Sequence, residues 1–209
     1  MKKIYLFIAI LVISLSVDAQ ELSKNGSNFK GGIRLGLTTS QISGDDLSGF
    51  NKLGAYAGGF TNFPISKTGY WNIQMEMNFI MKGSSTPPRK PNNPHFYNVY
   101  TLNLFYTETP FLVKCLLFKG FEVEAGPSIN FLFASTEKGP GGSNIKGRPF
   151  RIFELSIIAG ISYTFKEHWG ISARYSNSII PVRIPTWVYN RLVSKQFNST
   201  LAFSVFYQF

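Results

Sequence analysis

Apolar and polar residues alternate with a period of two over long stretches of the chain. Between residues 71 and 82, one set of alternating positions is apolar: Trp71, Ile73, Met75, Met77, Phe79 and Met81. The positions between them include the polar residues Asn72, Gln74, Glu76 and Asn78. The final stretch repeats the pattern, with Phe206 as an exception. Successive side chains of a β-strand point to opposite faces, so this periodicity predicts strands with one apolar and one mainly polar face.

Eight such stretches are predicted to be strands, and the segments between them alternate in length. The predicted strands are 29–38, 53–63, 71–82, 102–117, 121–133, 152–165, 168–176 and 197–209. The segments between them run long, short, long, short, long, short, long: 39–52, 64–69, 83–101, 118–120, 134–151, 166–167 and 177–196. Outer-membrane barrels have short periplasmic turns and longer external loops. The pattern therefore predicts that both termini lie in the periplasm.

The polar face decides between a soluble and a membrane barrel. Small and uncharged residues are frequent on it: Gly54, Gly58, Gly126, Ser128, Gly160, Ser162 and Thr164. Such residues make a poor solvated surface but fit the lumen of an eight-stranded barrel, which side chains just fill. Charged residues form only 15% of the chain, against about 25% in soluble domains, and aromatic residues form 16%. We therefore predict an all-β fold, an eight-stranded antiparallel up-and-down transmembrane β-barrel, and consider a lipocalin-like soluble barrel the weaker alternative.

The first residues have the composition of a secretory signal peptide. Lys2 and Lys3 precede an apolar segment from Ile4 to Val17, and small or tolerated residues precede Gln20. The segment has about fourteen apolar residues, fewer than the roughly 20 that a membrane-spanning helix needs. We predict a signal peptide at 1–19, a short periplasmic segment at 20–28 and the barrel at 29–209. Cleavage would lower the formal net charge from +10 to +9, because it removes two lysines and one aspartate.

Several short motifs, in this order and spacing, resemble the PorT-like outer-membrane β-barrel domain of Bacteroidetes-type bacteria. They are Lys30-Gly31-Gly32-Ile33, Ser43-Gly44-Asp45-Asp46, Phe63-Pro64-Ile65-Ser66, Glu108-Thr109-Pro110, Ala125-Gly126-Pro127, Ala159-Gly160-Ile161-Ser162-Tyr163 and Phe206-Tyr207-Gln208-Phe209. The resemblance covers nearly all of the predicted mature chain. It implies an eight-stranded barrel but no single function, since only some members of that family serve type IX secretion.

Strand alternation places many charged residues on the inward face. They are Arg34, Glu76, Glu108, Lys114, Glu122, Glu124, Glu154 and Arg174. A self-neutralising network of ion pairs that fills the lumen is the favoured interpretation, because unpaired charges there would be costly. The alternative is a gated ion or proton path lined by Glu76, Glu108, Lys114 and Arg174.

The predicted external loops and their strand ends are rich in basic residues. The basic residues there include Lys82, Arg89, Lys90, Lys138, Lys146, Arg148, Arg183, Arg191 and Lys195, and the acidic residue Glu137 lies among them. A solvated loop surface is one interpretation, and contact with the phosphates of lipopolysaccharide or with another anionic partner is the other. The candidate contacts are Arg89, Lys90, Lys146, Arg148, Arg183 and Arg191. Nucleic acid is not an expected partner, because the basic residues do not lie among aromatic residues on a solvent face.

Signals of catalysis and of metal binding are weak, and no catalytic, cofactor or metal site is predicted. The two histidines, His95 and His168, are expected at opposite ends of the barrel. Ser84 or Ser85 near His95 is the one conceivable nucleophile and base. The only cysteine, Cys115, has no intramolecular disulfide partner.

The final residue, Phe209, suggests an assembly signal for the barrel-assembly machinery, since a terminal strand must be recognised and paired before the barrel closes. Outer-membrane lipid is the other expected partner. The predicted function is a structural or interaction module of the cell envelope, with an envelope protein partner and with an export machine as one setting. A narrow gated channel is the alternative, and a surface enzyme is the third interpretation.

Overall fold

The computed structural model describes the predicted barrel but not the segment before it. It covers residues 30–44, 47, 49–66, 69–87, 100–139, 142–145, 149–166, 168–183, 187–188, 191–192 and 195–209. The predicted signal peptide and the segment 20–28 lie outside the described residues. In the part of the chain that is described, no helix is long and apolar enough to span a membrane.

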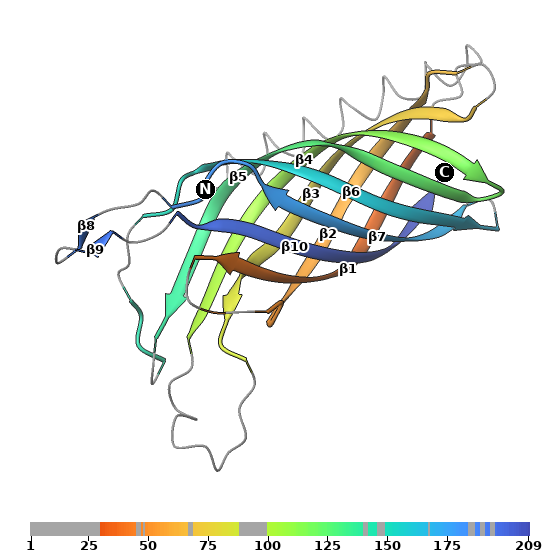
Figure 1. The fold of residues 1–209 in the computed structure, drawn as a ribbon. Helices are drawn as coiled ribbons and strands as arrows, with labels where there is room; N and C mark the ends of the chain where they lie inside the picture. Colours follow the sequence, from red (N-terminus) through yellow and green to blue (C-terminus); the bar gives the residue numbers. More distant parts are fainter. Residues whose placement is uncertain are drawn as a thin grey trace, which may run out of the picture.

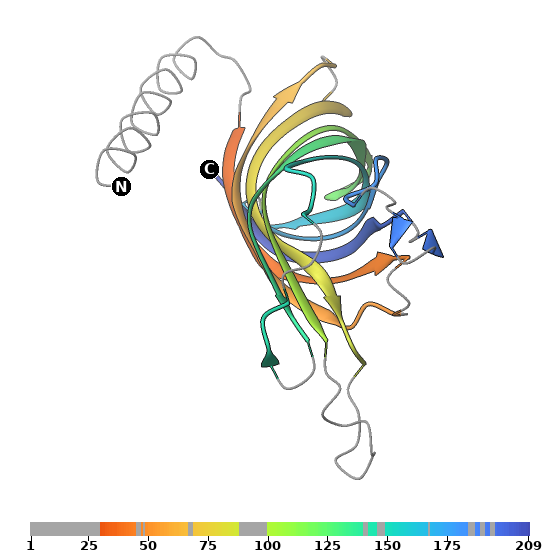
Figure 2. The same ribbon diagram turned by 90° about the vertical axis from the view of Figure 1, so that its left-hand side faces the viewer.

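Eight long antiparallel strands form a closed barrel, as the alternation predicted (Figures 1 and 2). They are β1 (Lys30–Ser43), β2 (Lys52–Pro64), β3 (Trp71–Ser85), β4 (Thr101–Phe118), β5 (Phe121–Lys138), β6 (Phe153–Phe165), β7 (Trp169–Ser178) and β10 (Phe197–Gln208). Each strand pairs with its neighbours in the sequence of long strands, and β1 pairs with β10 to close the ring. This closing register runs from Gly32 opposite Gln208 to Ser43 opposite Phe197. Closure leaves no strand edge in the lipid, where unpaired backbone groups would be costly.

The predicted alternation of long and short connections is also observed. Tight turns join β4 to β5 and β6 to β7, whereas the longer connections gather at the other end. We call these ends the short-turn end and the long-loop end. In the connection between β7 and β10, which was predicted to be a loop, the structure adds a separate two-stranded sheet of β8 (Trp187–Val188) and β9 (Arg191–Leu192). This short hairpin has no apolar alternation long enough to be detected in the sequence.

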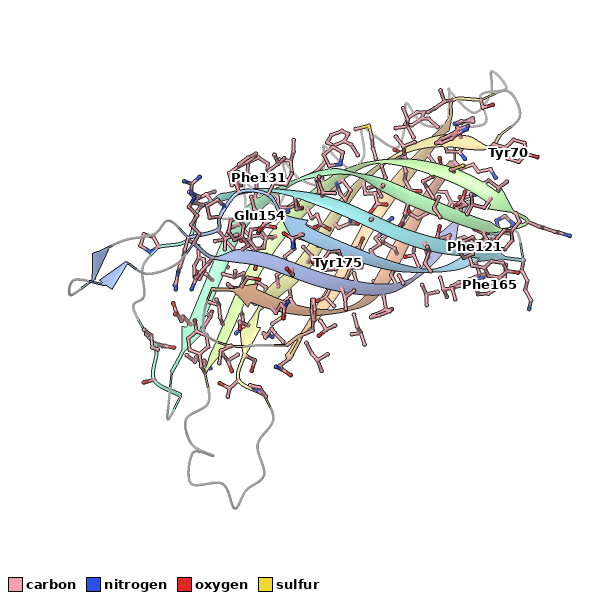
Figure 3. All side chains as sticks on the ribbon, in the orientation of Figure 1. Tyr70, Phe121, Phe131, Glu154, Phe165 and Tyr175 are labelled. Atoms are coloured by element: carbon pink, nitrogen blue, oxygen red, sulfur yellow. The ribbon has the colours of Figure 1, made fainter. Side chains whose placement is uncertain are left out.

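The outer face of the barrel is apolar. Side chains such as Leu35, Phe79 and Phe203 are more than half exposed, as expected for residues that contact lipid. Aromatic residues gather toward both ends of this face (Figure 3). At the short-turn end the rings of Phe118 and Phe121 stack 4.7 Å apart, and toward the long-loop end Phe131 and Phe153 meet edge to face at 5.7 Å. These two groups have the positions of the aromatic girdles that anchor outer-membrane barrels.

Several strands extend further at the long-loop end than the sequence predicted. The strand predicted at 29–38 continues to Ser43, and the one predicted at 121–133 continues to Lys138. A transmembrane strand needs about 9–11 residues, whereas β4 and β5 have 18 residues each. Figure 1 shows β3, β4 and β5 projecting together at this end. Backbone pairing needs no apolar alternation, so a strand can continue outside the hydrocarbon where the sequence pattern ends.

The inner face is mainly polar, as the sequence predicted, but it also includes apolar side chains. Toward the long-loop end a buried apolar cluster occupies the interior: Ile42, Tyr56, Ile80, Leu102, Leu104, Tyr106 and Ala202. Tyr100, Leu132 and Phe150 pack against it. The predicted small and polar inward residues occupy the remaining part of the interior, where Ser128, Ser162 and Asn78 are buried. The barrel therefore has an apolar cluster toward the long-loop end, and the rest of its lumen is mainly polar.

Candidate functional site

A four-residue group of opposite charges crosses the middle of the lumen. This central cluster consists of Arg34, Glu76, Glu124 and Arg174, which come from β1, β3, β5 and β7 and are each at most 4% exposed. The guanidinium of Arg174 donates to both oxygens of Glu76, at 2.7 and 2.8 Å, and also to both oxygens of Glu124. Arg34 pairs with Glu76 at 3.2 Å. Two positive and two negative charges cancel, so the cluster is neutral as a whole.

Tyr56 and two glycines make room for the central cluster and orient it. The hydroxyl of Tyr56 accepts a hydrogen bond of 2.9 Å from Arg174, and both residues are buried. A Cβ atom at Gly160 would lie 2.8 Å from Cγ of Arg174, and one at Gly58 would lie 2.1 Å from Oδ1 of Asn78. Asn78 itself donates to Glu76 at 2.8 Å. Glycine is needed at these inward positions because a larger residue would displace the paired side chains.

A second group of charges, the distal cluster, lies toward the long-loop end. Lys82 donates to Glu154 at 3.0 Å, and its Nζ lies 3.1 Å from Glu108, although the geometry to that oxygen is not that of a hydrogen bond. Asn130 and Asn198 donate to the two oxygens of Glu154, at 2.9 and 2.6 Å. The distal cluster therefore carries one positive and two negative formal charges.

The position of Lys82 corrects the sequence analysis, which counted it among the external basic residues. Its side chain is 1% exposed and lies inside the barrel. The available signal was the continuation of the inward series Gln74, Glu76, Asn78 and Ile80 by one more alternate position. It was missed because β3 was predicted to end there, whereas the strand continues to Ser85.

Near the short-turn end, an ion pair lies beside two aromatic rings. Lys114 contacts Glu122 at 2.5 Å, and Ser162 donates to the same carboxylate at 3.2 Å. Phe206, the residue that broke the alternation, is buried inside the barrel and meets Phe60 edge to face at 5.8 Å. Arg34 lies 5.1 Å from the centre of the Phe60 ring, and Lys114 lies 5.9 Å from that of Phe206. These cation–π contacts join the charged and aromatic parts of the lumen.

The structure thus places all eight charged residues that were expected to point inward on the inner face of the barrel, in three groups. Glu108 and Glu154 belong to the distal cluster, Lys114 and Glu122 form the pair near the short-turn end, and the other four form the central cluster. Sequence reasoning could not assign Tyr56 to this arrangement, because a tyrosine at an inward strand position carries no charge signal. The role of these pairs in stability or conduction stays a prediction.

Some buried polar atoms of the lumen make no hydrogen bond to another described residue. Among the described residues they include Nε of Arg34, Oε1 of Gln74, Oδ1 of Asn78, Oε1 of Glu108, Oδ1 of Asn198 and Oγ1 of Thr200. Buried polar groups are usually satisfied by protein or by ordered water. The polar part of the lumen is therefore suited to hold internal water between the ion pairs.

At the long-loop end, a salt bridge holds the connection after β7 against β5. Arg183 contacts Glu137 at 2.5 Å, and its guanidinium carbon lies 3.8 Å from the centre of the Phe150 ring. Tyr100 donates to the other oxygen of Glu137 at 2.7 Å. The adjacent Val182 is 1% exposed. We call Tyr100, Glu137, Phe150, Val182 and Arg183 the latch.

The latch corrects the prediction that Arg183 is a free contact for anionic partners. The side chain is buried and engaged by Glu137 and Phe150, so its charge is already neutralised. Of the other predicted contacts, Arg89, Lys90, Lys146 and Arg148 lie outside the described residues. Arg191 lies on β9, and its side chain also lies outside what the structure describes.

Phe209 follows β10 at the seam where the barrel closes. Its backbone N–H donates to the carbonyl of Gly31 at 2.9 Å, and its ring covers the space beside Gly31 where a Cβ atom would lie 2.9 Å from Cε2. The ring is 69% exposed and lies 6.4 Å from that of Tyr207. This position, on the lipid-facing side of the closing seam, is the one expected for it. Its role as an assembly signal is untested and stays a prediction.

The catalytic candidates do not form a site in the described residues. Ser84 is 2% exposed on the inward face, and Ser85 donates to backbone carbonyls. His95, the proposed base, lies outside the described residues. His168 lies at the short-turn end, where Nδ1 is 2.8 Å from the carbonyl oxygen of Gln208. Within the described ranges, no group of three or more His, Cys, Asp or Glu residues could hold a metal ion.

The closed barrel, its apolar outer face and its aromatic girdles indicate an outer-membrane protein, and comparison with known families tests this. The family model for the outer membrane protein beta-barrel domain matches residues 18–183. The chain belongs to this outer-membrane β-barrel family. It is accordingly a protein of the bacterial outer membrane. Comparison with curated protein sequences gives no match.

Solved structures of outer-membrane barrels share the fold of this family member at low sequence identity. The attachment invasion locus protein Ail of Yersinia pestis is 13% identical, with 86% of this chain and 98% of Ail covered and a TM-score of 0.51. Neisserial surface protein A is 11% identical, with 88% of this chain and 98% of that protein covered and a TM-score of 0.52. At this identity the likeness concerns the fold alone.

Proposed function

We propose that this outer-membrane barrel is a structural or interaction module of the cell envelope and does not conduct ions in its resting state. The observation that carries the proposal is the central cluster, in which Arg174 crosses the lumen and binds both Glu76 and Glu124. An ion path through this level would have to separate buried pairs, and that would leave uncompensated charges at a cost of several kcal/mol. The apolar cluster and the latch add a further barrier at the long-loop end.

The proposed orientation places the short turns and both termini in the periplasm and the long loops outside the cell. It is supported by the usual arrangement of outer-membrane barrels, in which the external connections are the longer ones. The projecting ends of β3, β4 and β5 would then extend from the outer surface. These ends and the adjacent loops form the part of the protein that a partner outside the membrane would meet.

The proposed partner surface is basic. Arg89, Lys90, Lys146, Arg148 and Arg191 remain the candidate contacts for lipopolysaccharide phosphates or for an acidic surface of an envelope protein. Within the described residues, Lys138 and Lys195 at the same end are exposed. Clustered lysines and arginines attract such anions at long range and most strongly at low salt. The similarly folded Ail has been crystallised with sucrose octasulfate, a heparin analogue, which supports a polyanion as the first class of ligand to test.

The resemblance to PorT-like barrels makes an export machine the first protein partner to test. A photo-reactive residue in place of Asn144, which is exposed at the long-loop end, should cross-link to lipopolysaccharide or to a defined envelope protein in whole cells. The matched control carries the photo-reactive residue in place of Lys119, which is exposed at the short-turn end. Equal cross-linking to the same external partner from both positions would contradict the proposed partner surface.

A narrow gated channel is the second candidate function, favoured by the buried polar atoms of the lumen that make no hydrogen bond among the described residues. Internal water beside Gln74 and Asn198 would provide part of a hydrated path. Single-channel recording of the purified barrel in a planar bilayer separates the two functions. The module predicts no stable conductance for the native chain, whereas regular open levels would support the channel.

A further inference from the structure

A vestibule with both polar and apolar lining residues opens at the short-turn end, next to the ion pair of Lys114 and Glu122. It has a volume of about 940 Å³, and the ends of β1 to β6 and of β10, with the turns beside them, contribute to its lining. Figure 3 marks this end by Tyr70, Phe121 and Phe165. The vestibule is separate from the latch and from the basic loops at the opposite end.

Three lysines reach the vestibule from different parts of the chain. Lys30 begins β1, Lys119 lies in the turn after β4, and Lys166 lies in the turn after β6. Each is exposed, and none of them has a salt bridge with another residue that the structure describes. Among the described residues of the lining, Glu122 has the only acidic side chain, and its carboxylate is engaged by Lys114. The described side chains of the lining therefore carry an excess of positive charge.

A buried amide oxygen in the same lining lacks a partner. Asn62 is 7% exposed, and its Oδ1 makes no hydrogen bond to any described residue. The other buried asparagines of β3 and β5, Asn78 and Asn130, donate their amide hydrogens to glutamates. Because the O and N atoms of an amide are assigned from their neighbours, the Asn62 group can present either an acceptor or a donor to a bound molecule. An unsatisfied buried amide costs about 1–3 kcal/mol, which a ligand or water would recover.

We propose that this vestibule binds an anion whose phosphate or carboxylate oxygens are contacted by Lys30, Lys119 and Lys166 and by the amide of Asn62. Lysine ammonium groups act as point charges toward such oxygens, and the protein wall lowers the screening on one side. The volume is sufficient for a small multiply charged anion rather than a single ion. This inference goes beyond the proposed function, because it concerns the opposite end of the barrel and needs no conduction and no external partner.

Two sources could supply these oxygens: a soluble anion or the headgroup of an anionic lipid. The first arm of the test uses folded barrel in nanodiscs of zwitterionic phosphatidylcholine, titrated with inorganic pyrophosphate and followed by NMR. We expect saturable shifts of residues at the short-turn end. The triple variant Lys30→Gln, Lys119→Gln, Lys166→Gln should bind at least tenfold more weakly. The matched control replaces three exposed basic residues at the other end, Lys138→Gln, Arg151→Gln and Lys195→Gln, and should bind as the native chain does.

The second arm omits pyrophosphate and replaces part of the lipid by phosphatidylglycerol, whose retention on the barrel is measured by native mass spectrometry. Retention that depends on the three lysines would assign the site to a lipid headgroup, and binding in the first arm alone would assign it to a soluble anion. Asn62→Leu, which keeps the charge, should weaken whichever binding is found several-fold while leaving the heat-modifiable folded form intact. No saturable binding in either arm, or equal losses in the triple variant and its control, would overturn the proposal.

Discussion

The two ends of this barrel treat their charged residues in opposite ways. At the long-loop end, Arg183 is buried, paired with Glu137 and stacked over Phe150, next to an interior filled by Leu102 and Leu104. At the short-turn end, three exposed lysines line an open vestibule and have no acidic partner among the described residues. Arg183 therefore has a structural role at the long-loop end, whereas the charges of the lysines at the short-turn end are available for binding.

The difference shows that charge is available for binding only where the structure leaves it unpaired. An arginine in the latch contributes to packing and to the position of a loop, whereas the positive charge of a lysine at the vestibule can attract an anionic ligand. The central cluster lies between the two ends. Its charges, like that of Arg183, are buried and paired. The predictions below alter the paired regions first and the exposed ones last.

The largest effect is expected from the central cluster. Arg174→Ala would leave Glu76 and Glu124 buried without their main partner, which should lower the free energy of unfolding by about 3–5 kcal/mol. Urea unfolding of the refolded barrel measures this, and Arg151→Ala is the control, because Arg151 is exposed and should change stability by less than about 0.5 kcal/mol. Glu76→Ala should act like Arg174→Ala. Neither variant should conduct, and a large stable conductance in either would favour the channel instead.

Breaking the latch should have a smaller and more local effect. Arg183→Ala removes the salt bridge to Glu137 and the contact with Phe150, for which we expect a loss of about 1–3 kcal/mol. The loss should appear as faster proteolysis within residues 179–196, with the barrel itself still heat-modifiable. Lys195→Ala is the control in the same connection. If both variants are cleaved at the native rate, the latch does not hold this connection.

Deletion of Phe209 should affect assembly more than the finished barrel. The exposed ring adds about 1–2 kcal/mol at most to the folded state, so the native barrel should remain stable once formed. The inserted, heat-modifiable form should decrease in cells, and unassembled chain should accumulate in the periplasm. Deletion of Gly141 and Gly142 in a long loop is the control. Equal insertion yields for the two deletions would show that Phe209 has no role in assembly.

The smallest change in stability is expected from single cysteines that report the orientation of the two ends. In a Cys115→Ser background, Asn144→Cys should react with a membrane-impermeant maleimide on intact cells, and Lys119→Cys should react only after the outer membrane is opened. Both positions are exposed, so the substitutions should change stability by less than about 0.5 kcal/mol. The reverse labelling pattern would place the vestibule outside the cell and the latch in the periplasm.

Much of the fold could be predicted because its signal is local. The alternation in β3 identifies a strand and both of its faces without reference to any other segment, and the same rule places Glu76 and Arg174 inward. Prediction was wrong where that signal ends. Lys82 is the last residue of its predicted strand and was counted with the adjacent loop, and Arg183 lies in a connection with no periodicity, so both were assigned to the solvated surface.

The sequence by itself determined that this chain forms amphipathic strands, joined alternately by short and long segments, with an apolar surface suited to lipid. These properties depend on neighbouring residues along one strand. Only the tertiary structure decided that Arg174 binds both Glu76 and Glu124, that Phe60 meets Phe206, and that three lysines from distant parts of the chain line one vestibule. Such partners lie on different strands, and their meeting depends on the register and closure of the whole barrel, which no single strand encodes.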